Sequence, residues 1–378
     1  MIKLLMINYE FPPIGGGGAN ANLQLLKQFA GNPELQIDLL TSAPEPGVFT
    51  EEFAPNVKVT RVGVHKKSLQ CWRKIEVIEW LMKADKVCRQ MVRSNDYDLA
   101  HAFFAFPSGW LCYRNRGKLP YLVSLRGSDV PGLNPRFKLD YKLLAPLFRR
   151  IWKNSKLLVA CSNGLKERAK NFMPEADYTV ICNGVDTDLF KPGRNCSDGT
   201  FNLITVGRLS ATKRLDLLVE AVGILRDKKH DVRLSVVGTG QLENELREDV
   251  AEKGLEHAIE LSGHLKPKEV CRLYRKSDAY ISGTMSEGMS NSMLEAMACG
   301  LPLISTDCEG LEELLDGNGI AVADANPGAL ADAVERLIAQ PEMLKSMSEI
   351  SRERALRFSW QDSAAQYMSL YNEILAKS

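Results

Sequence analysis

The 378-residue sequence lacks any apolar run near the ~18 residues that a membrane-spanning helix requires. The opening MIKLLMINYE reaches Tyr9 and Glu10 before the apolar core of a signal peptide could form. Short-period repeats and low-complexity tracts are also missing. We therefore expect a cytoplasmic protein, with no spanning segment and no secretory leader.

The nine cysteines form no C-x-x-C pair and no Cys/His cluster at zinc spacing. An odd, scattered set of this kind predicts reduced thiols that are mostly buried. We expect no metal site and no cofactor.

Two nucleotide-binding patterns are absent as well. Four glycines, Gly15–Gly18, follow the first predicted strand, but neither G-x-G-x-x-G nor a GK[ST] ending is present. No acidic residue stands near the end of the second strand to hold a ribose, which argues against an NAD enzyme. The glycines still allow a ligand to approach the backbone before a helix start, so Gly16 and Gly17 are candidate contacts. A flexible loop is the alternative.

The composition, 45% hydrophobic and 25% charged, is typical of a globular protein, and the length predicts two domains. The net charge of +1 hides an asymmetry. Residues 1–190 hold 26 Lys/Arg against 18 Asp/Glu, and the remainder holds 22 against 29. The basic half is the better candidate to meet an anionic surface or substrate.

Short β-rich apolar runs alternate with amphipathic segments along the chain, which predicts an α/β protein with parallel sheets. The turn-rich stretch 183–200 predicts a linker between two doubly wound domains. Ligands of such domains bind beyond the carboxyl ends of the strands. The predicted strands are 2–8, 35–40, 57–62, 98–103, 120–125, 156–161 and 178–183, then 201–207, 232–238, 259–263, 279–283, 301–306 and 319–323.

Cations gather after the first strand of the second half, in VGRLSATKR. Arg208 and Lys213 stand where a strand ends and a helix begins, which suits a diphosphate: Arg is a forked donor and Lys a point charge. A solvated turn with scattered charge is an equal alternative.

Two carboxylates stand eight residues apart in EGMSNSMLE, residues 287–295. Glu287 follows a predicted strand, and Glu295 lies inside a predicted helix. The small residues between them can present N–H groups to an anion. The alternative is a capping box, in which Glu295 satisfies a backbone donor near Ser292 and Glu287 is a surface residue.

These segments resemble motifs of the retaining nucleotide-sugar glycosyltransferases of family 4. EGMSNSMLE is similar to their E-x7-E motif and GRLSATKR to their G-R-L-x-x-x-K motif, and the order and spacing match over nearly the whole chain. The resemblance implies the GT-B fold, two Rossmann-like domains that face each other across a cleft. Residues 1–190 would form the acceptor domain and 191–358 the donor domain, with a C-terminal helix at 359–378 that crosses back to the first domain.

The resemblance also implies roles for individual residues. Arg208 and Lys213 would hold the donor diphosphate, Glu295 the ribose hydroxyls, and Glu287 the donor sugar. The N–H groups of Gly288, Met289, Ser290 and Asn291 would surround the phosphates, and His264 and Leu265 would border the base.

The first half departs from the family pattern in two places. DLAHAFFAF keeps His101 but has Phe103 at the second position of an H-x-H, and SLRGSDV has Arg126 where H-G-x-D is frequent. His101 and Asp129 remain candidates to orient sugar or acceptor hydroxyls. The D-x-D at 186–188 has the form of a metal motif, but its place in the linker favours a turn role for Asp186.

Basic and aromatic residues interleave in 65–93 and 136–156. The second segment has seven Lys/Arg against Asp140, with an apolar face of Phe137, Tyr141, Leu144, Phe148, Ile151 and Trp152. Such a helix can lie on an anionic bilayer, here the inner face of the cell membrane. The alternative is that the apolar face packs on the sheet, and Pro146 would kink or interrupt the helix. Nothing resembles a nucleic-acid module, so nucleic acid is not an expected partner.

Together these features predict a retaining, metal-independent glycosyltransferase. It would move a sugar from a nucleoside-diphosphate sugar to a hydroxyl of a saccharide or lipid-linked acceptor, in polysaccharide or glycolipid biosynthesis. Three alternatives stay open: a nucleotide-sugar epimerase on the same fold, an NAD-type oxidoreductase, and a non-catalytic nucleotide-sugar-binding protein.

Overall fold

The computed structural model describes residues 1–69, 71–132, 138–193 and 199–377. The chain divides into two compact units, Met1–Asn183 with Trp360–Ser378, and Gly184–Ser359. Within the described residues no helix combines the length and apolar character needed to cross a membrane. None of the eight described cysteines forms a disulfide, and most of them are buried.

The first unit is built on an eight-stranded sheet in the order β3-β4-β2-β1-β5-β6-β7-β8. All neighbours are parallel except β3 and β4. Its strands are β1 (Ile2–Asn8), β2 (Leu35–Ala43), β3 (Val48–Ala54), β4 (Val57–Gly63), β5 (Leu99–Phe103), β6 (Tyr121–Leu125), β7 (Leu158–Ala160) and β8 (Tyr178–Val180). Its helices are α1 (Gly17–Phe29), α2 (Lys74–Ser94), α3 (Ser108–Asn115), α4 (Lys138–Lys153), α5 (Asn163–Phe172) and α13 (Trp360–Ala376).

The second unit has a six-stranded parallel sheet in the order β11-β10-β9-β12-β13-β14. One core cluster combines aliphatic side chains from alternate positions of the strands, which share one face of the sheet, with those of the helices that cover that face. The strands are β9 (Phe201–Val206), β10 (Val232–Val237), β11 (Ile259–Gly263), β12 (Ala279–Ser282), β13 (Leu303–Thr306) and β14 (Gly319–Val322). The helices are α6 (Leu215–Asp227), α7 (Glu243–Glu252), α8 (Pro267–Tyr274), α9 (Asn291–Ala298), α10 (Leu311–Leu314), α11 (Pro327–Ala339) and α12 (Pro341–Ala355), with a 3₁₀ turn at Ala211–Lys213.

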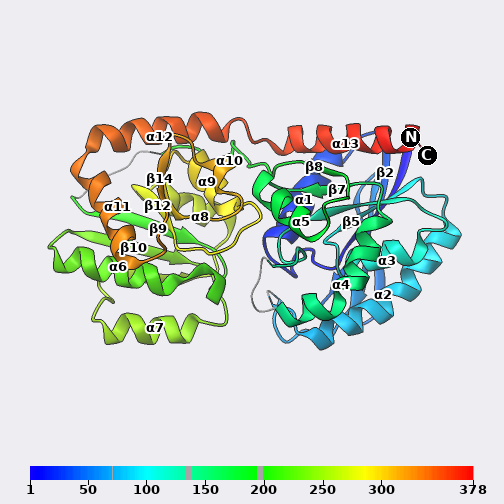
Figure 1. Ribbon diagram of the computed structural model, residues 1–378, viewed down its shortest axis with the longest axis horizontal. Coiled ribbons are helices and arrows are strands. Elements are labelled where there is room, and N and C mark those ends of the chain that lie inside the picture. Colours follow the sequence, from blue (N-terminus) through cyan, green and yellow to red (C-terminus); the bar gives the residue numbers. More distant parts are fainter. Residues whose placement is uncertain (70, 133–137, 194–198, 378) are drawn as a thin grey trace. The chain divides into compact units, whose positions relative to one another are not determined.

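The last helix, α13, packs in the first unit beside α1 (Figure 1). Its buried side chains include Trp360, Tyr367 and Tyr371, three of the aromatic residues that give the segment its helical periodicity. Ser363 adds a hydrogen bond from its hydroxyl to the carbonyl of Cys182, 2.8 Å away. The C-terminal segment therefore completes the first unit, although the whole second unit lies between this segment and residues 1–183 in the sequence.

The predicted α/β class with parallel sheets is confirmed, and every predicted strand is present. One strand was missed: β3 is an antiparallel edge strand next to β4. Five of its seven residues are exposed, among them Glu51 and Glu52, so it lacks the continuous apolar run on which the prediction relied.

Helix α4 tests the two interpretations of the segment 136–156. Tyr141, Phe148, Ile151 and Trp152 are buried, so most of the predicted apolar face packs within the unit. Phe137 lies outside the described residues. The helix continues through Pro146, which is exposed. The expected interruption at this proline is therefore absent.

Candidate active site

The second sheet changes direction at β9. The chain moves outward from β9 to β10 and β11, and then returns to the opposite side of β9 with β12. The loops after β9 and β12 therefore leave the sheet in opposite directions, and a binding crevice forms between them at the carboxyl edge. A pocket at this edge is lined by Gly207, Arg208, Lys213, Val237 and Tyr280, among others.

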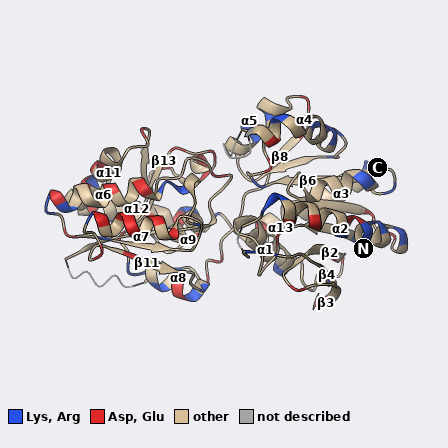
Figure 2. Cartoon of the chain, turned by 90° about the horizontal axis from the view of Figure 1, so that it is seen from below, with Lys and Arg blue, Asp and Glu red and all other residues tan. Residues whose placement is uncertain are grey.

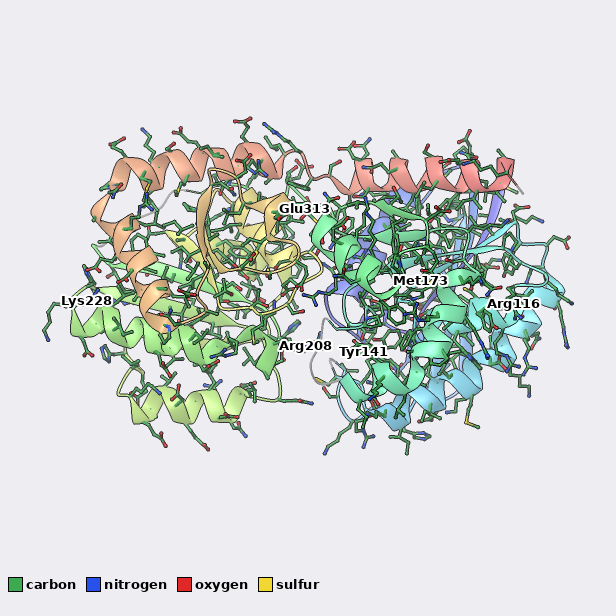
Figure 3. The ribbon with its side chains drawn as sticks, in the orientation of Figure 1. Arg116, Tyr141, Met173, Arg208, Lys228 and Glu313 are labelled. Atoms are coloured by element: carbon green, nitrogen blue, oxygen red, sulfur yellow. The ribbon has the colours of Figure 1, made fainter. Side chains whose placement is uncertain are left out.

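The loop after β9 is held by close backbone packing. A Cβ atom on Gly238 would lie 1.9 Å from the carbonyl oxygen of Gly207, so only glycine fits there. Leu209 N donates to the carbonyl of Thr239 at 3.0 Å. These contacts fix the path of the chain around Arg208, whose side chain is exposed at the strand end (Figure 3).

The loop after β12 is tied to the same place. Met285 N donates to the carbonyl of Thr212 at 3.0 Å, directly beside Lys213. Lys213 Nζ then forms an ion pair with Glu287 Oε1, and both side chains are about four-fifths buried. Burial alone would lower the pKa of Lys213, but the Glu287 carboxylate and other nearby groups, Tyr280 among them, together outweigh burial and raise that pKa. Lys213 is therefore a fixed cation in the crevice.

The residues between the two glutamates lead into α9. Ser290 is the N-cap, and its Oγ accepts a hydrogen bond from Met293 N. Gly288 lies against the next loop, where a Cβ atom on Gly310 would be 2.5 Å from the Gly288 carbonyl oxygen. This packing sets the N-terminus of α9, the end that favours anions, beside the Lys213–Glu287 pair.

Glu295 lies in the second turn of α9 and is partly buried. Its Oε2 atom is 3.4 Å from the hydroxyl of Tyr274, which also donates to the carbonyl of Ser292 at 3.1 Å. Burial raises the pKa of the carboxyl to about 7. The alternative capping box is not formed, because Ser290 and not Ser292 occupies the N-cap.

Sequence reasoning missed the tyrosines that support these groups. Tyr280 on β12 lies 2.9 Å from Ser292 Oγ and 3.4 Å from the carbonyl of Val206, so it joins α9 to the end of β9. Tyr274 on α8 holds Glu295. Neither tyrosine stands at a fixed spacing from a motif. From the sequence alone, both would be assigned to the hydrophobic core.

His264 and Leu265 follow β11 at the same edge of the sheet. The carbonyl of Gly263 accepts a hydrogen bond from Gly238 N at 2.8 Å, which links their loop to the one after β10. His264 is exposed and Leu265 is partly buried. Within the second unit, the structure thus brings Arg208, Lys213 and residues 287–295 together, with His264 and Leu265 two strands away.

Gly16 and Gly17 belong to the first unit. Gly16 is the N-cap of α1, and Gly17 is the first residue of that helix. Their loop is packed: a Cβ atom on Gly18 would lie 2.5 Å from the ring of Phe104, and Gly15 N donates to the carbonyl of Leu69 at 2.8 Å. Packing of this kind does not fit the flexible-loop alternative.

His101 is buried on β5, with both ring nitrogens engaged. Nδ1 lies 2.8 Å from the hydroxyl of Tyr371, and Nε2 lies 2.7 Å from Ser124 Oγ. Ser124 Oγ in turn lies 2.8 Å from the hydroxyl of Tyr367. A contact with sugar or acceptor hydroxyls, as predicted for His101, does not fit this environment, because no ring nitrogen is left for a ligand. The residue instead connects the sheet to α13.

Asp129 is also buried and engaged. Its Oδ2 accepts from Ala105 N at 2.6 Å, and its Oδ1 accepts from the backbone N–H groups of Arg126 and Gly127 at 2.9 and 3.0 Å. The predicted role in orienting hydroxyls does not fit here either. Asp129 fixes the loop after β6 to the loop after β5.

The two departures from the family pattern lie together. The guanidinium of Arg126 sits over the ring of Phe103, 5.6 Å from its centroid, and Nη2 donates to Asn183 Oδ1 at 2.6 Å. Asp186, at the D-x-D sequence, accepts backbone hydrogen bonds from Asp188 and Leu189, which confirms its turn role. Among the described side chains, no group of three or more His, Cys, Asp or Glu residues could hold a metal ion.

Comparison with known proteins agrees with this architecture. The family model "Glycosyltransferase Family 4" matches residues 15–189, and "Glycosyl transferases group 1" matches residues 187–354. An uncharacterized glycosyltransferase of Methanocaldococcus jannaschii is 28% identical over 99% of both chains. A D-inositol 3-phosphate glycosyltransferase of Corynebacterium glutamicum is 30% identical over 74% of this chain and 73% of its own.

Solved structures of similar fold include sucrose-phosphate synthase from Thermosynechococcus elongatus, with a TM-score of 0.87 and 19% identity over the whole of both chains. The Anabaena protein HepE, solved with UDP and glucose, has a TM-score of 0.77 and 17% identity over 98% of this chain and 100% of its own. The chain has two parallel-sheet units, the family models together match residues 15–354, and one relative is 30% identical. The chain therefore belongs to the family 4 glycosyltransferases and has the GT-B fold.

Proposed function

We propose that this glycosyltransferase is retaining and metal-independent, and that it transfers a sugar from a nucleoside-diphosphate sugar to a hydroxyl of a saccharide or lipid-linked acceptor. In this proposal the first unit receives the acceptor and the second unit binds the donor. Polysaccharide or glycolipid biosynthesis is the corresponding process.

One observation carries the proposal: the Lys213–Glu287 ion pair at the direction change of the second sheet, next to the N-terminus of α9. Cleavage of the donor leaves a diphosphate, and fixed charges act most strongly where new charge develops. Lys213, Arg208 and the start of α9, with the N–H groups of 288–291, supply that positive potential. Glu287 holds Lys213 in place and faces the donor sugar.

The remaining roles follow from position. Glu295 accepts hydrogen bonds from the ribose hydroxyls, His264 and Leu265 border the base, and Gly16 and Gly17 let the donor approach the first unit. The anomeric C–O bond breaks, a new C–O bond forms to the acceptor oxygen on the same face, and the acceptor proton passes to the departing diphosphate. Neither glutamate acts as a nucleophile, because Lys213 pairs with one and Tyr274 contacts the other.

Solved structures of similar fold support a nucleotide donor. HepE was solved with UDP-glucose, and the catalytic domain of Arabidopsis starch synthase IV with ADP and acarbose. We keep a cytoplasmic location at the inner face of the cell membrane as part of the proposal, because a lipid-linked acceptor would be met there.

The test is turnover of UDP-, GDP- and ADP-sugars with saccharide and lipid-linked acceptors, in buffer with EDTA. Proton NMR of the product reads the anomeric configuration. The proposal predicts a transferred sugar that keeps the donor's configuration. Loss of activity in EDTA with recovery in manganese would refute metal independence, and an inverted product would refute retention.

The same assay separates the alternatives. A donor converted to a stereoisomeric nucleotide sugar without transfer identifies an epimerase. Binding of a nucleotide sugar without any turnover identifies a binding protein. Binding of NADH with no affinity for nucleotide sugars identifies an oxidoreductase.

A further inference from the structure

The first unit exposes apolar side chains on two helices that are joined at their first turns. Lys74 Nζ of α2 and Asp140 Oδ1 of α4 form an ion pair at 2.7 Å. Beside this pair, five large apolar side chains keep between 56% and 73% of their surface exposed. We call them the α2–α4 patch: Ile75, Ile78, Met82, Leu139 and Leu143.

The packing of α2 keeps its part of the patch outside. Trp80 is fully buried, and Glu76 is buried in an ion pair with Lys66 at 2.9 Å. The neighbouring Lys66 ammonium, with backbone and Arg73 donors, outweighs the burial of Glu76 and lowers its pKa to about 2. A rotation that hid Ile78 and Met82 would pull this carboxylate and the indole out of their contacts.

The packing of α4 has the same effect. Phe148, Ile151 and Trp152 are buried, and the hydroxyl of Tyr141 donates to the carbonyl of Ser128 at 2.5 Å. Leu139 and Leu143, one turn apart, are therefore left on the outer face.

Both helices carry Lys and Arg residues, which are blue in Figure 2. Lys86 and Arg93 follow the patch along α2, where they line a shallow hollow with Arg89, and Arg150 and Lys153 follow it along α4. The four acids of the two helices are all paired with cations: Glu76 with Lys66, Glu79 with Lys83, Asp85 with Arg89 and Asp140 with Lys74. Within the described part of the chain, Lys86, Arg93, Lys142, Arg150 and Lys153 have no acidic partner.

We propose that the α2–α4 patch is the surface by which the protein docks on an anionic lipid bilayer. Exposed apolar side chains beside unpaired cations match the acyl boundary and the headgroups of such a bilayer. An ordinary protein surface carries charges of both signs, so it matches a group of cations less well than a uniformly anionic bilayer does. The sequence raises the membrane expectation for the basic segments 65–93 and 136–156, and the patch assigns it to residues that the sequence pattern had not singled out. It does not depend on the chemistry of the proposed reaction.

Flotation of the full chain tests the proposal, with vesicles of phosphatidylcholine alone or mixed with phosphatidylglycerol. We expect binding to the mixed vesicles only, weakened by salt because the cations are exposed. The double variant Leu139→Ser/Leu143→Ser should lose at least about tenfold in partitioning, since burial of apolar side chains drives insertion. Replacing Arg150 and Lys153 by Gln should lower partitioning onto the mixed vesicles about fivefold for each charge removed.

Matched controls come from the second unit. Leu356→Ser removes a leucine that is 53% exposed, and Lys345→Gln removes an exposed lysine of α12. Both should bind vesicles as the unsubstituted protein does, and thermal melts should show that every variant is folded. Failure of the unsubstituted protein to bind mixed vesicles, or equal binding by the patch variants, would overturn the proposal. Light scattering that shows a dimer abolished by the patch variants would instead assign the surface to a second copy of the chain.

Discussion

Glu295 is a carboxyl group held where its charge is unfavourable. Its pKa of about 7 in the folded protein, against 4.5 for the ordinary side chain, means that burial opposes ionisation. A folded-state pKa above the unfolded one stabilises the fold at low pH, and this contribution is lost as pH rises from 4.5 through 7. At pH 8 the ionised group costs about 3 kcal/mol. An acid retained at such a cost is typical of a functional site.

Glu295→Gln should therefore stabilise the protein by about 3 kcal/mol at pH 8 and change little at pH 4. Denaturant unfolding at both pH values measures this. The same variant should lose affinity for nucleotide sugars, because an amide accepts fewer hydrogen bonds from ribose. Unchanged stability at pH 8 would show that the carboxyl is not held in a low-polarity site.

Lys213 and Glu287 should behave as a coupled pair. Lys213→Ala should weaken nucleoside diphosphate binding about tenfold or more, because it removes a charge-assisted contact. Glu287→Gln should mainly lower turnover. In a double-mutant cycle with Ala at each position, unfolding free energies should show a coupling of about 1 kcal/mol or more. Additive effects of the two substitutions would mean that the ion pair contributes nothing.

At the scale of elements, α13 depends on a buried histidine. Burial, and then the nearby Arg126 charge, lowers the pKa of His101 from 6.5 to about 3. A depressed histidine pKa gives stability that is fully present above pH 6.5 and is lost as pH falls toward 3. About 2 kcal/mol should be lost by pH 5.

His101→Gln should lower stability at pH 8, because the contacts with Tyr371 and Ser124 are disturbed. The variant should also lack most of the decrease in unfolding free energy that the unsubstituted protein shows between pH 8 and pH 5. Denaturant curves at the two pH values give both quantities. If the variant and the unsubstituted protein lose equal stability on acidification, another group is responsible for the acid sensitivity.

The sequence pattern predicts a strand or helix only where buried positions of that element carry apolar residues and exposed positions carry polar ones. The apolar runs of β1 and β9 identify buried parallel strands, whereas β3 carries exposed glutamates and has no such run. On α2 the buried Glu76 and the exposed Ile78 reverse the usual assignment of polar and apolar faces. Glu76 can be buried because it forms an ion pair with Lys66, a tertiary contact that the sequence pattern of α2 does not indicate.

At the scale of the whole molecule, the sequence predicts which loops gather, because parallel strands end at one edge of their sheet. It therefore brings Arg208, Lys213 and Glu287 to one place. It does not predict that His101 and Asp129 are buried and fully engaged, since a strand-end position alone does not distinguish a ligand contact from a structural tie. The supporting roles of Tyr274 and Tyr280 come from packing across the sheet, which no local spacing encodes.

We propose that a nucleoside diphosphate binds at the loops after β9 and β12. Calorimetric titration of UDP, GDP and ADP into the unsubstituted protein, Arg208→Ala, Lys213→Ala and the surface control Lys345→Ala tests it directly. We expect at least one nucleotide to bind, Arg208→Ala and Lys213→Ala each to weaken that binding by about tenfold or more, and Lys345→Ala to leave it unchanged. Equal affinity in all four proteins, or no binding by any nucleotide to the folded protein, would contradict it.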